Sequence, residues 1–269
     1  KMELGATASL QLIVDATDSN AAIIVNRYAS SILADYLLEM YRKRLQRFGN
    51  LGSLKPPVAV ETRAWFNDNL MSRWSFVPGV IAMVVMLVSL MLTALAVVRE
   101  REIGTMEQIL VTPIGPLEFL LGKTIPFVII SIIEAAVVTA VGILWFEVPF
   151  RGSFAVLFLG TLTFLINSVG LGLLISTVSS TQQQAMMIGT FILTPVIMLS
   201  GLVFPIRNMP LFFQCLTYLN PLRYFVIVAQ DLFLKGVGLA VLWPQMAGMT
   251  ILGTAFLALA TLRFKRTLA

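Results

Sequence analysis

The chain contains no histidine, a single cysteine and few charged residues, and each scarcity excludes a class of protein. Without histidine there is no imidazole for acid–base catalysis and no histidine ligand for a metal. The single thiol, Cys215, forms neither an internal disulfide nor a zinc cluster, and we expect it to be a buried structural residue. Charged residues make up 12% of the 269 residues, about half the share found in soluble domains.

Apolar residues dominate what remains. The chain is 58% hydrophobic and its mean hydropathy is +0.88. Soluble domains have about 45–50% apolar residues, so this composition indicates an integral membrane protein in contact with lipid. The formal net charge of +5 does not indicate a nucleic-acid partner, because basic residues that flank membrane spans account for it.

Residues 1–75 are polar enough for a water-soluble domain. A strand is predicted at 10–14 and a second one at 58–66. Between them, the Asp18–Asn20 cluster is typical of a helix N-cap, and the basic run 42–44 favours a helix end. Strand, helix and strand in this order predict the C-terminal part of a small external α/β domain.

Residues 76–269 have the pattern of a mainly α-helical, multi-pass membrane domain. Runs of roughly 20 apolar residues, the length that a bilayer core requires, predict transmembrane helices near 77–98, 124–146, 153–178, 185–204 and 240–262. The segment 205–239 is also apolar, but prolines and glycine interrupt it. We therefore expect it to form short re-entrant helices that pack against protein.

The number of predicted spans determines the orientation. Five spans place the N-terminal domain and the C-terminus on opposite sides of the membrane. The basic cluster at 263–266 directly follows the last span, which predicts a cytoplasmic C-terminus and an external (periplasmic) N-terminal domain. An external domain needs a way across the membrane, so we expect one further span before residue 1, for a total of six.

The stretch 99–113 concentrates charge between the first two predicted spans. With Ile103 and Leu110 on the other side, it predicts an amphipathic helix on the inner membrane face. Such helices usually have a basic polar face, whereas this one is acidic, which favours a basic protein partner over lipid. An ordinary interfacial linker helix is the alternative. The candidate docking residues are Arg99, Glu100, Arg101, Glu102, Gly104, Thr105, Glu107 and Gln108.

One acidic residue lies inside a predicted span. Glu134 is near the middle of the second one, where an ionisable side chain costs on the order of 3 kcal/mol. It is therefore a candidate for a translocation path. The alternative is an interhelical hydrogen bond to Ser168 or Asn167.

Further path candidates follow the fourth span, namely Phe204, Arg207 and Met209. Arg207 either belongs to a solvated loop or helps to ring an outer vestibule with Arg223, Asp231 and Lys235.

Two glycine motifs have different explanations. Gly122–Thr124 matches the end of a phosphate-binding loop, but the first glycine of that motif would stand at the position of Leu117. We therefore expect no ATP site and no enzymatic activity in this chain, and Lys123 to be an interfacial anchor. Glycines within the spans predict close helix packing; they are Gly142, Gly170 and Gly172.

Several segments resemble the type 2 ABC transporter permeases of the drug-export class. The resemblance covers 98–113, 175–185 and 199–210, and also the external pieces 14–20 and 75–79, in the same order along nearly the whole chain. It implies a membrane subunit with six spans and a large external domain between the first and the second. The five spans predicted here agree with an additional one before residue 1.

The resemblance also implies partners and an activity. Two permease subunits, identical or homologous, would pair with two ATPase subunits that use ATP and Mg²⁺, while this chain itself binds no cofactor or metal. The 99–113 stretch would be the coupling helix, with the second cytoplasmic turn, Thr181, Gln182 and Gln183, on the same side. Some members also use a periplasmic adaptor. The implied function is ATP-driven export of amphiphilic drugs or lipid-like compounds across the inner membrane.

Two other functions remain open at this point. An ion-coupled secondary transporter needs ionisable residues within the membrane and usually internal repeats. The sequence offers Glu134 and no evident repeat. A membrane scaffold that transports nothing is the third possibility.

Overall fold

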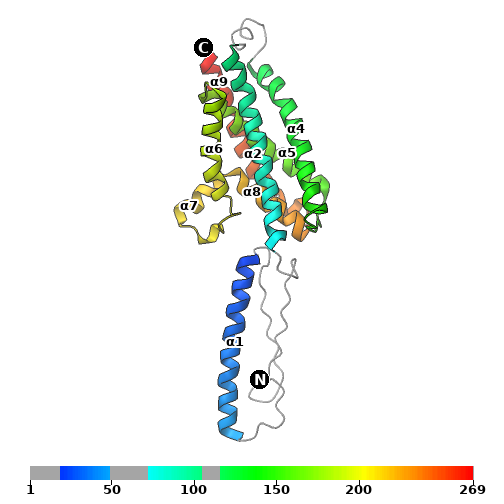
Figure 1. Ribbon diagram of the computed structural model, residues 1–269, viewed down its shortest axis with the longest axis vertical. Helices are drawn as coiled ribbons and strands as arrows, with labels where there is room; N and C mark the ends of the chain where they lie inside the picture. The colour runs from blue at the N-terminus through cyan, green and yellow to red at the C-terminus, as the bar shows by residue number, and fades with distance from the viewer. Residues whose placement is uncertain (1–18, 49–71, 105–115, 269) are drawn as a thin grey trace. The chain divides into compact units, whose positions relative to one another are not determined.

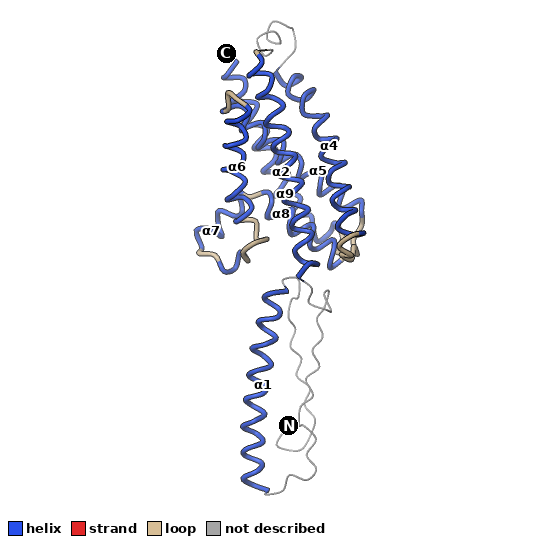
Figure 2. Tube along the Cα trace, in the orientation of Figure 1, coloured by secondary structure: helices blue, strands red, loops and turns tan. Residues whose placement is uncertain are grey.

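The computed structural model describes residues 19–48, 72–104 and 116–268. The chain divides into two compact units, residues 1–75 and 76–269. Helices make up the regular structure of the described residues, which contain no strand (Figure 2). The strands predicted at 10–14 and 58–66 lie outside these residues. The all-helical character of the described part goes against the predicted α/β domain.

The first unit contributes one long helix, α1 (Ser19–Phe48), so the helix predicted after the Asp18–Asn20 cluster is confirmed. It continues beyond the basic run at 42–44 where we expected it to end. Lys43 Nζ lies 2.6 Å from Glu39 Oε1, one turn earlier on the same helix. This hydrogen bond and the positive charge of Lys43 lower the pKa of the exposed Glu39 carboxyl.

The second unit is a helical bundle (Figure 1). Four of its helices are long and apolar enough to cross a membrane, and a bent pair of short helices raises this number to at most five among the described residues. The four are α2 (Ser72–Ile103), α4 (Pro116–Leu144), α5 (Phe154–Val178) and α9 (Leu239–Leu268). They confirm four of the predicted spans.

The fourth predicted span, 185–204, is wrong at its C-terminal end. The helix there, α6 (Gln182–Met198), has 17 residues, at the short limit for crossing a bilayer. Pro195 lies in its last turn, and Gly201 follows with φ of +88°, a left-handed conformation that ends helices. The apolar run that predicted the span continues beyond the point where the backbone breaks.

Residues 199–238, here called the broken segment, form short helices as predicted. They include α7 (Leu211–Leu216) and α8 (Pro221–Gln230), and the axis bends by 85° between Leu211–Leu219 and Pro221–Lys235. Asn220 caps α8, since its Oδ1 accepts a hydrogen bond from the Leu222 N–H at 3.0 Å. Its Nδ2 donates to the Val196 carbonyl at 2.7 Å, which ties α8 to the last turn of α6.

Glycines bring the long helices together, as predicted from Gly142, Gly170 and Gly172. A Cβ on Gly172 of α5 would lie 2.7 Å from the Leu90 carbonyl of α2, and one on Gly170 would lie 2.9 Å from Phe256 Cβ of α9. A Cβ on Gly142 of α4 would lie 3.0 Å from a side-chain carbon of Ile81 on α2. Helix α5 therefore packs closely against both α2 and α9.

The expectation of a buried Cys215 is wrong. The cysteine is exposed, because it lies on α7, a six-residue helix with no buried residue. The apolar sequence around it indicated burial, but a short helix in the broken segment has few neighbours to cover its faces.

Candidate functional site

Most of the predicted docking residues that the structure describes gather at one end of the bundle, here called the charged end. It consists of the C-terminal end of α2, the N-terminal end of α4 and the turn between α5 and α6, which lie together in Figure 1. Residues 99–104, the described part of the predicted cytoplasmic segment 99–113, lie about 80 residues from the second turn in sequence and meet it here. Three charged residues of α2 make the contacts.

Arg101 binds the C-terminal end of α5. Its Nη1 donates to the Ser179 carbonyl at 2.9 Å and lies 3.4 and 3.5 Å from the carbonyls of Ser176 and Thr177. The last carbonyls of a helix have no intrahelical partner, and the helix dipole places partial negative charge there. A guanidinium satisfies both requirements, so Arg101 caps α5 from a neighbouring helix.

Glu102 binds the N-terminal end of α6. Its Oε2 accepts hydrogen bonds from the Gln182 side-chain Nε2 at 2.9 Å and from the Gln182 backbone N–H at 3.1 Å. The bond to the Gln182 side chain lowers the pKa of the Glu102 carboxyl most, and the bond to the Gln182 backbone lowers it further. This carboxyl lies beyond the apolar part of α2, which ends near Val98. An acidic group at a helix N-terminus is also favoured by the dipole.

The second turn has its own cap. Thr181 Oγ1 accepts from the Gln184 N–H at 3.2 Å, and Gln184 Oε1 accepts from the Ser180 N–H at 2.8 Å. This reciprocal arrangement is close to a capping box and starts α6. Among the predicted residues of the turn, Thr181 is therefore structural, Gln182 binds Glu102, and Gln183 is exposed.

Glu100 connects α2 to α4. Its Oε1 lies 2.5 Å from Lys123 Nζ, and both side chains are partly buried, with 21% and 38% of their surface exposed. Lys123 was predicted to be an interfacial anchor, and the structure shows that it pairs with an acid. Arg99, which precedes this group, is exposed.

The prediction of one amphipathic helix over 99–113 is wrong at its N-terminal part. Residues 99–103 continue α2, which ends at Gly104 with φ of +85°, where the Gly104 N–H donates to the Arg101 carbonyl at 3.2 Å. Glycine is the residue that ends helices in this left-handed conformation. Thr105, Glu107 and Gln108 lie outside the described residues.

The structure gives Glu134 no hydrogen-bond partner. Both of its carboxyl oxygens are buried within α4, and Ser131 Oγ one turn earlier is also unpaired. The proposed bond to Ser168 or Asn167 is not formed, since Ser168 Oγ and Asn167 Oδ1 are themselves unsatisfied. The Asn167 amide instead donates to the Met249 carbonyl at 2.9 Å and joins α5 to α9.

The other path candidates lie apart from Glu134. Phe204 and Arg207 are exposed and Met209 is partly buried, all on the connection between α6 and α7. In Figure 1 this connection and α4 lie on different sides of α2. The structure therefore does not unite the four candidates in one site.

The predicted vestibule residues make local contacts. The Arg223 guanidinium lies over the Tyr218 ring, 4.0 Å from its centroid, and donates to Thr217 Oγ1. Lys235 and Asp231 pair with each other at 2.9 Å. These contacts stabilise the turns of the broken segment.

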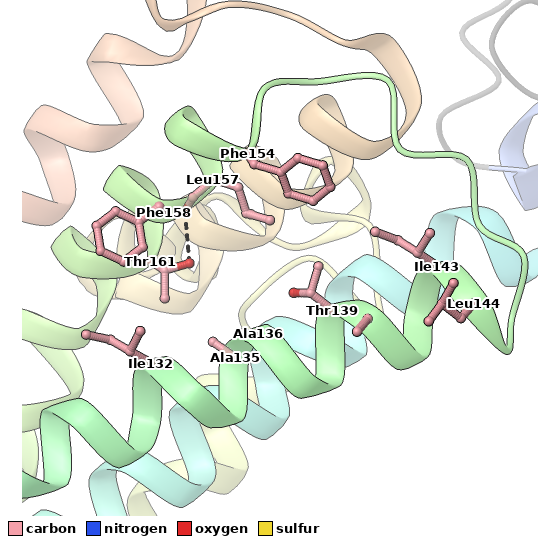
Figure 3. A pocket seen from close by; sticks show the side chains of 11 residues that line it. Ile132, Ala135, Ala136, Thr139, Ile143, Leu144, Phe154, Leu157, Phe158 and Thr161 are labelled. Atoms are coloured by element: carbon pink, nitrogen blue, oxygen red, sulfur yellow. Dashed lines mark hydrogen bonds between the residues drawn. The ribbon is translucent and has the colours of Figure 1, made fainter.

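Sequence reasoning missed a cavity of about 510 Å³ between α4 and α5 (Figure 3). Two of its lining residues are threonines, and Thr161 Oγ1 donates to the Leu157 carbonyl of its own helix at 2.9 Å. The only signal in the sequence is a group of alanines one turn apart on α4. The lining residues are Ile132, Ala135, Ala136, Thr139, Ala140, Ile143, Leu144, Phe154, Leu157, Phe158 and Thr161.

A bundle of helices long and apolar enough to span a membrane defines a multi-pass membrane protein. Within the described ranges, no group of three acids, cysteines or histidines is placed to hold a metal. Comparison with known proteins identifies the class further. The sequence model of the ABC-2 type transporter family matches residues 36–234, and the chain belongs to that family.

Curated relatives agree along almost the whole chain. The probable multidrug ABC transporter permeases YbhR and YbhS of Escherichia coli (strain K12) are 36% identical over 268 residues and 35% over 264. These alignments cover 99% and 98% of this chain and 70% and 68% of the relatives. The inner membrane transport permease YhhJ of the same strain is 31% identical over 272 residues, 98% of this chain and 69% of YhhJ.

The chain is thus the permease subunit of an ABC exporter, and the family implies an ABC ATPase partner and a dimeric assembly. The secondary transporter and the scaffold are not supported.

Proposed function

We propose that the charged end faces the cytoplasm and docks the ATPase subunits. The observation that carries this proposal is the position of the end of α9. Helix α9 ends at the same end of the bundle as α2, where α4 also begins and where the α5–α6 turn lies (Figure 1). The sequence there includes the basic cluster 263–266, and basic residues next to a span favour the cytoplasmic side. Residues 1–75 are then external, in the periplasm of a cell with an inner membrane.

The exposed residues of this end define the docking surface. Arg99 and Gln183 are exposed, and the Glu102–Gln182 bonds bring their two segments together. Thr105, Glu107 and Gln108, which follow Gly104 in the sequence, remain further candidates for docking. In this proposal the ATPase holds ATP and Mg²⁺, two copies of this chain or two homologues form the membrane pore, and a periplasmic adaptor carries the substrate onward.

Replacing the exposed Arg99 with glutamate is expected to lower the amount of ATPase that copurifies with the permease about tenfold. Glu100 and Glu102 bind within the subunit, which leaves the cation Arg99 exposed, so the ATPase group opposite it is expected to be acidic. A reversed charge at the rim of an interface then weakens association because like charges oppose each other. The measurement is quantitative pull-down of the co-expressed subunits. The matched control is Arg151→Glu, which reverses the charge of an exposed residue in the connection between α4 and α5. Equal losses in the two variants would contradict docking at the charged end.

The cavity between α4 and α5 supports an amphiphilic substrate. Its volume of about 510 Å³ lies in the range of about 300–1,000 Å³ that small-molecule sites occupy. Its lining is almost entirely aliphatic and aromatic, which suits the apolar part of a drug or lipid-like compound (Figure 3). Glu134 is on the same helix but is not among the lining residues, which share another face of α4.

Ala136→Phe is expected to fill this cavity and to raise the KM for export of a bulky amphiphile, rhodamine 6G, about tenfold. A pocket contact that changes by one to a few carbon groups alters binding by about 1–3 kcal/mol. Export is measured in proteoliposomes that contain the permease and its ATPase. The control is Ala255→Phe on an exposed position of α9. An unchanged KM in Ala136→Phe removes the cavity from the substrate path.

A further inference from the structure

Three consecutive residues of α2 hold three different elements of the bundle. Glu100 binds Lys123 of α4, Arg101 binds the carbonyls that end α5, and Glu102 binds the start of α6. We propose that Glu100–Glu102 form a clasp through which the ATPase, by moving the end of α2, moves the ends of α4, α5 and α6 with it. The inference rests on the proposed docking at the charged end.

The signs of the charges make the clasp directional. A cation meets the negative end of α5 and an anion meets the positive end of α6, although α5 and α6 are consecutive helices joined by a short turn. Exchanging Arg101 and Glu102 would place each charge against a helix end of the same sign. The side chains therefore recognise the two helix ends individually, and a force on α2 reaches both.

Below the clasp, α2 and α5 are in rigid contact. The Gly172 position approaches the α2 backbone closely, and Val97, Leu173 and Phe264 form a buried cluster of α2, α5 and α9 near the charged end. Packed interiors transmit displacement instead of absorbing it. The links to α4 and α6 at the charged end, by contrast, consist of polar side chains. Farther along, α2 also packs against Gly142 of α4 and Gly189 of α6 through the side chains of Ile81 and Met91. The clasp is thus the polar joint through which movement of the end of α2 reaches the ends of these two helices.

Helix α6 continues this path to the opposite end of the bundle. It starts at Gln182, where Glu102 holds it, and its last turn accepts the hydrogen bond from Asn220, the cap of α8. A 17-residue helix is about 26 Å long, nearly the thickness of a bilayer core. Displacement of the clasp therefore reaches the broken segment, which contains α7 and the exposed Cys215.

The test uses the complete permease–ATPase complex in proteoliposomes, with rhodamine 6G as the transported probe. The first readout is the amount of probe exported per ATP hydrolysed. The second is the rate at which Cys215, the single cysteine of the chain, reacts with a maleimide in the same complex in detergent, with and without ATP and vanadate. Retention of the ATPase on the permease is measured on the same samples.

Glu102→Ala is expected to leave the ATPase bound and active, while export per ATP falls about tenfold. Coupling between two sites typically changes a response by about 5–150-fold. The response of Cys215 to ATP is expected to disappear as well. Glu102→Gln keeps an acceptor oxygen for Gln182 but loses the charge that faces the start of α6, so its export per ATP is expected to lie between those of Glu102→Ala and the wild type. Glu118→Ala, which removes an exposed acid from the first turn of α4, is the control.

The ion pair between Glu100 of α2 and Lys123 of α4 allows a second, independent test. Glu100→Lys is expected to lower export per ATP, and Glu100→Lys with Lys123→Glu is expected to restore it. Normal coupling in Glu102→Ala overturns the inference, as does loss of the ATPase from that variant, because Glu102 would then be a docking residue. If the reaction rate of Cys215 in the wild type is the same with and without ATP, movement is not transmitted through α6 and that part of the inference is wrong. Failure of the wild-type permease to retain an ATPase contradicts the proposed function instead.

Discussion

Gly172→Leu is expected to prevent α5 from packing against α2 and to leave little folded permease. A Cβ at this position would lie 2.7 Å from the Leu90 carbonyl oxygen, 2.9 Å from Thr93 Cβ and 3.2 Å from the Ala94 nitrogen. Two of these atoms belong to the backbone of α2, so they cannot rotate away as a flexible side chain would. Overpacking costs about 1–3 kcal/mol where neighbours adjust, and leucine against backbone is expected to cost at least about 3 kcal/mol.

The measurement is the apparent melting temperature and the monodisperse fraction in detergent. Gly122→Leu is the matched control, because Gly122 is also a helical glycine, at the start of the apolar part of α4, but has no atom near its Cβ position. Leucine there is expected to be neutral or to stabilise α4 by up to about 1 kcal/mol through helix propensity. A Gly172→Leu variant that melts like the wild type would show that α2 and α5 separate more easily than their packing indicates.

The sequence predicted the places of the four long helices because membrane crossing depends on local composition. A run of apolar residues of bilayer length is visible without any partner. The same property explains the error at 185–204, since hydropathy averages over the run and does not register that Pro195 and Gly201 end the helix early. The exposed Cys215 is an error of the same kind, because apolar neighbours in sequence do not guarantee neighbours in space.

The charged end shows what a single sequence could not provide. The residues Glu100, Arg101 and Glu102 stood out as charged, and acidity suggested a basic protein partner. Their actual partners lie 23, 78 and 80 residues away in the chain, and they include backbone carbonyls that have no sequence signature at all. The sequence thus identified the chemically important residues but assigned outward contacts to side chains that bind within the subunit.

Glu134→Leu is expected to make the permease more stable and to reduce export of the cationic amphiphile rhodamine 6G at least about tenfold. Both carboxyl oxygens are buried and unpaired. A buried polar group without a partner destabilises a protein by about 1–3 kcal/mol, and leucine removes that cost. A group that weakens the fold and binds nothing within it is available to a substrate, and a carboxyl group inside a membrane span suits a cation with an apolar body.

Glu134→Gln tests whether the charge of the side chain, as distinct from its size, is needed for export. The amide keeps the size and the hydrogen-bonding capacity of the carboxyl group but cannot become an anion. We expect it to reduce export of rhodamine 6G nearly as much as leucine does, and to leave export of the uncharged dye Nile red within about twofold, because only the cation loses a counter-charge. Glu118→Gln, at the exposed start of the same helix, controls for loss of an acid from α4.

If Glu134→Gln exports every tested compound at the wild-type rate, the carboxyl group has no part in transport. An increase in melting temperature of Glu134→Leu without any loss of export would then identify Glu134 as a destabilising residue of the membrane core, and the path would have to run elsewhere in the bundle.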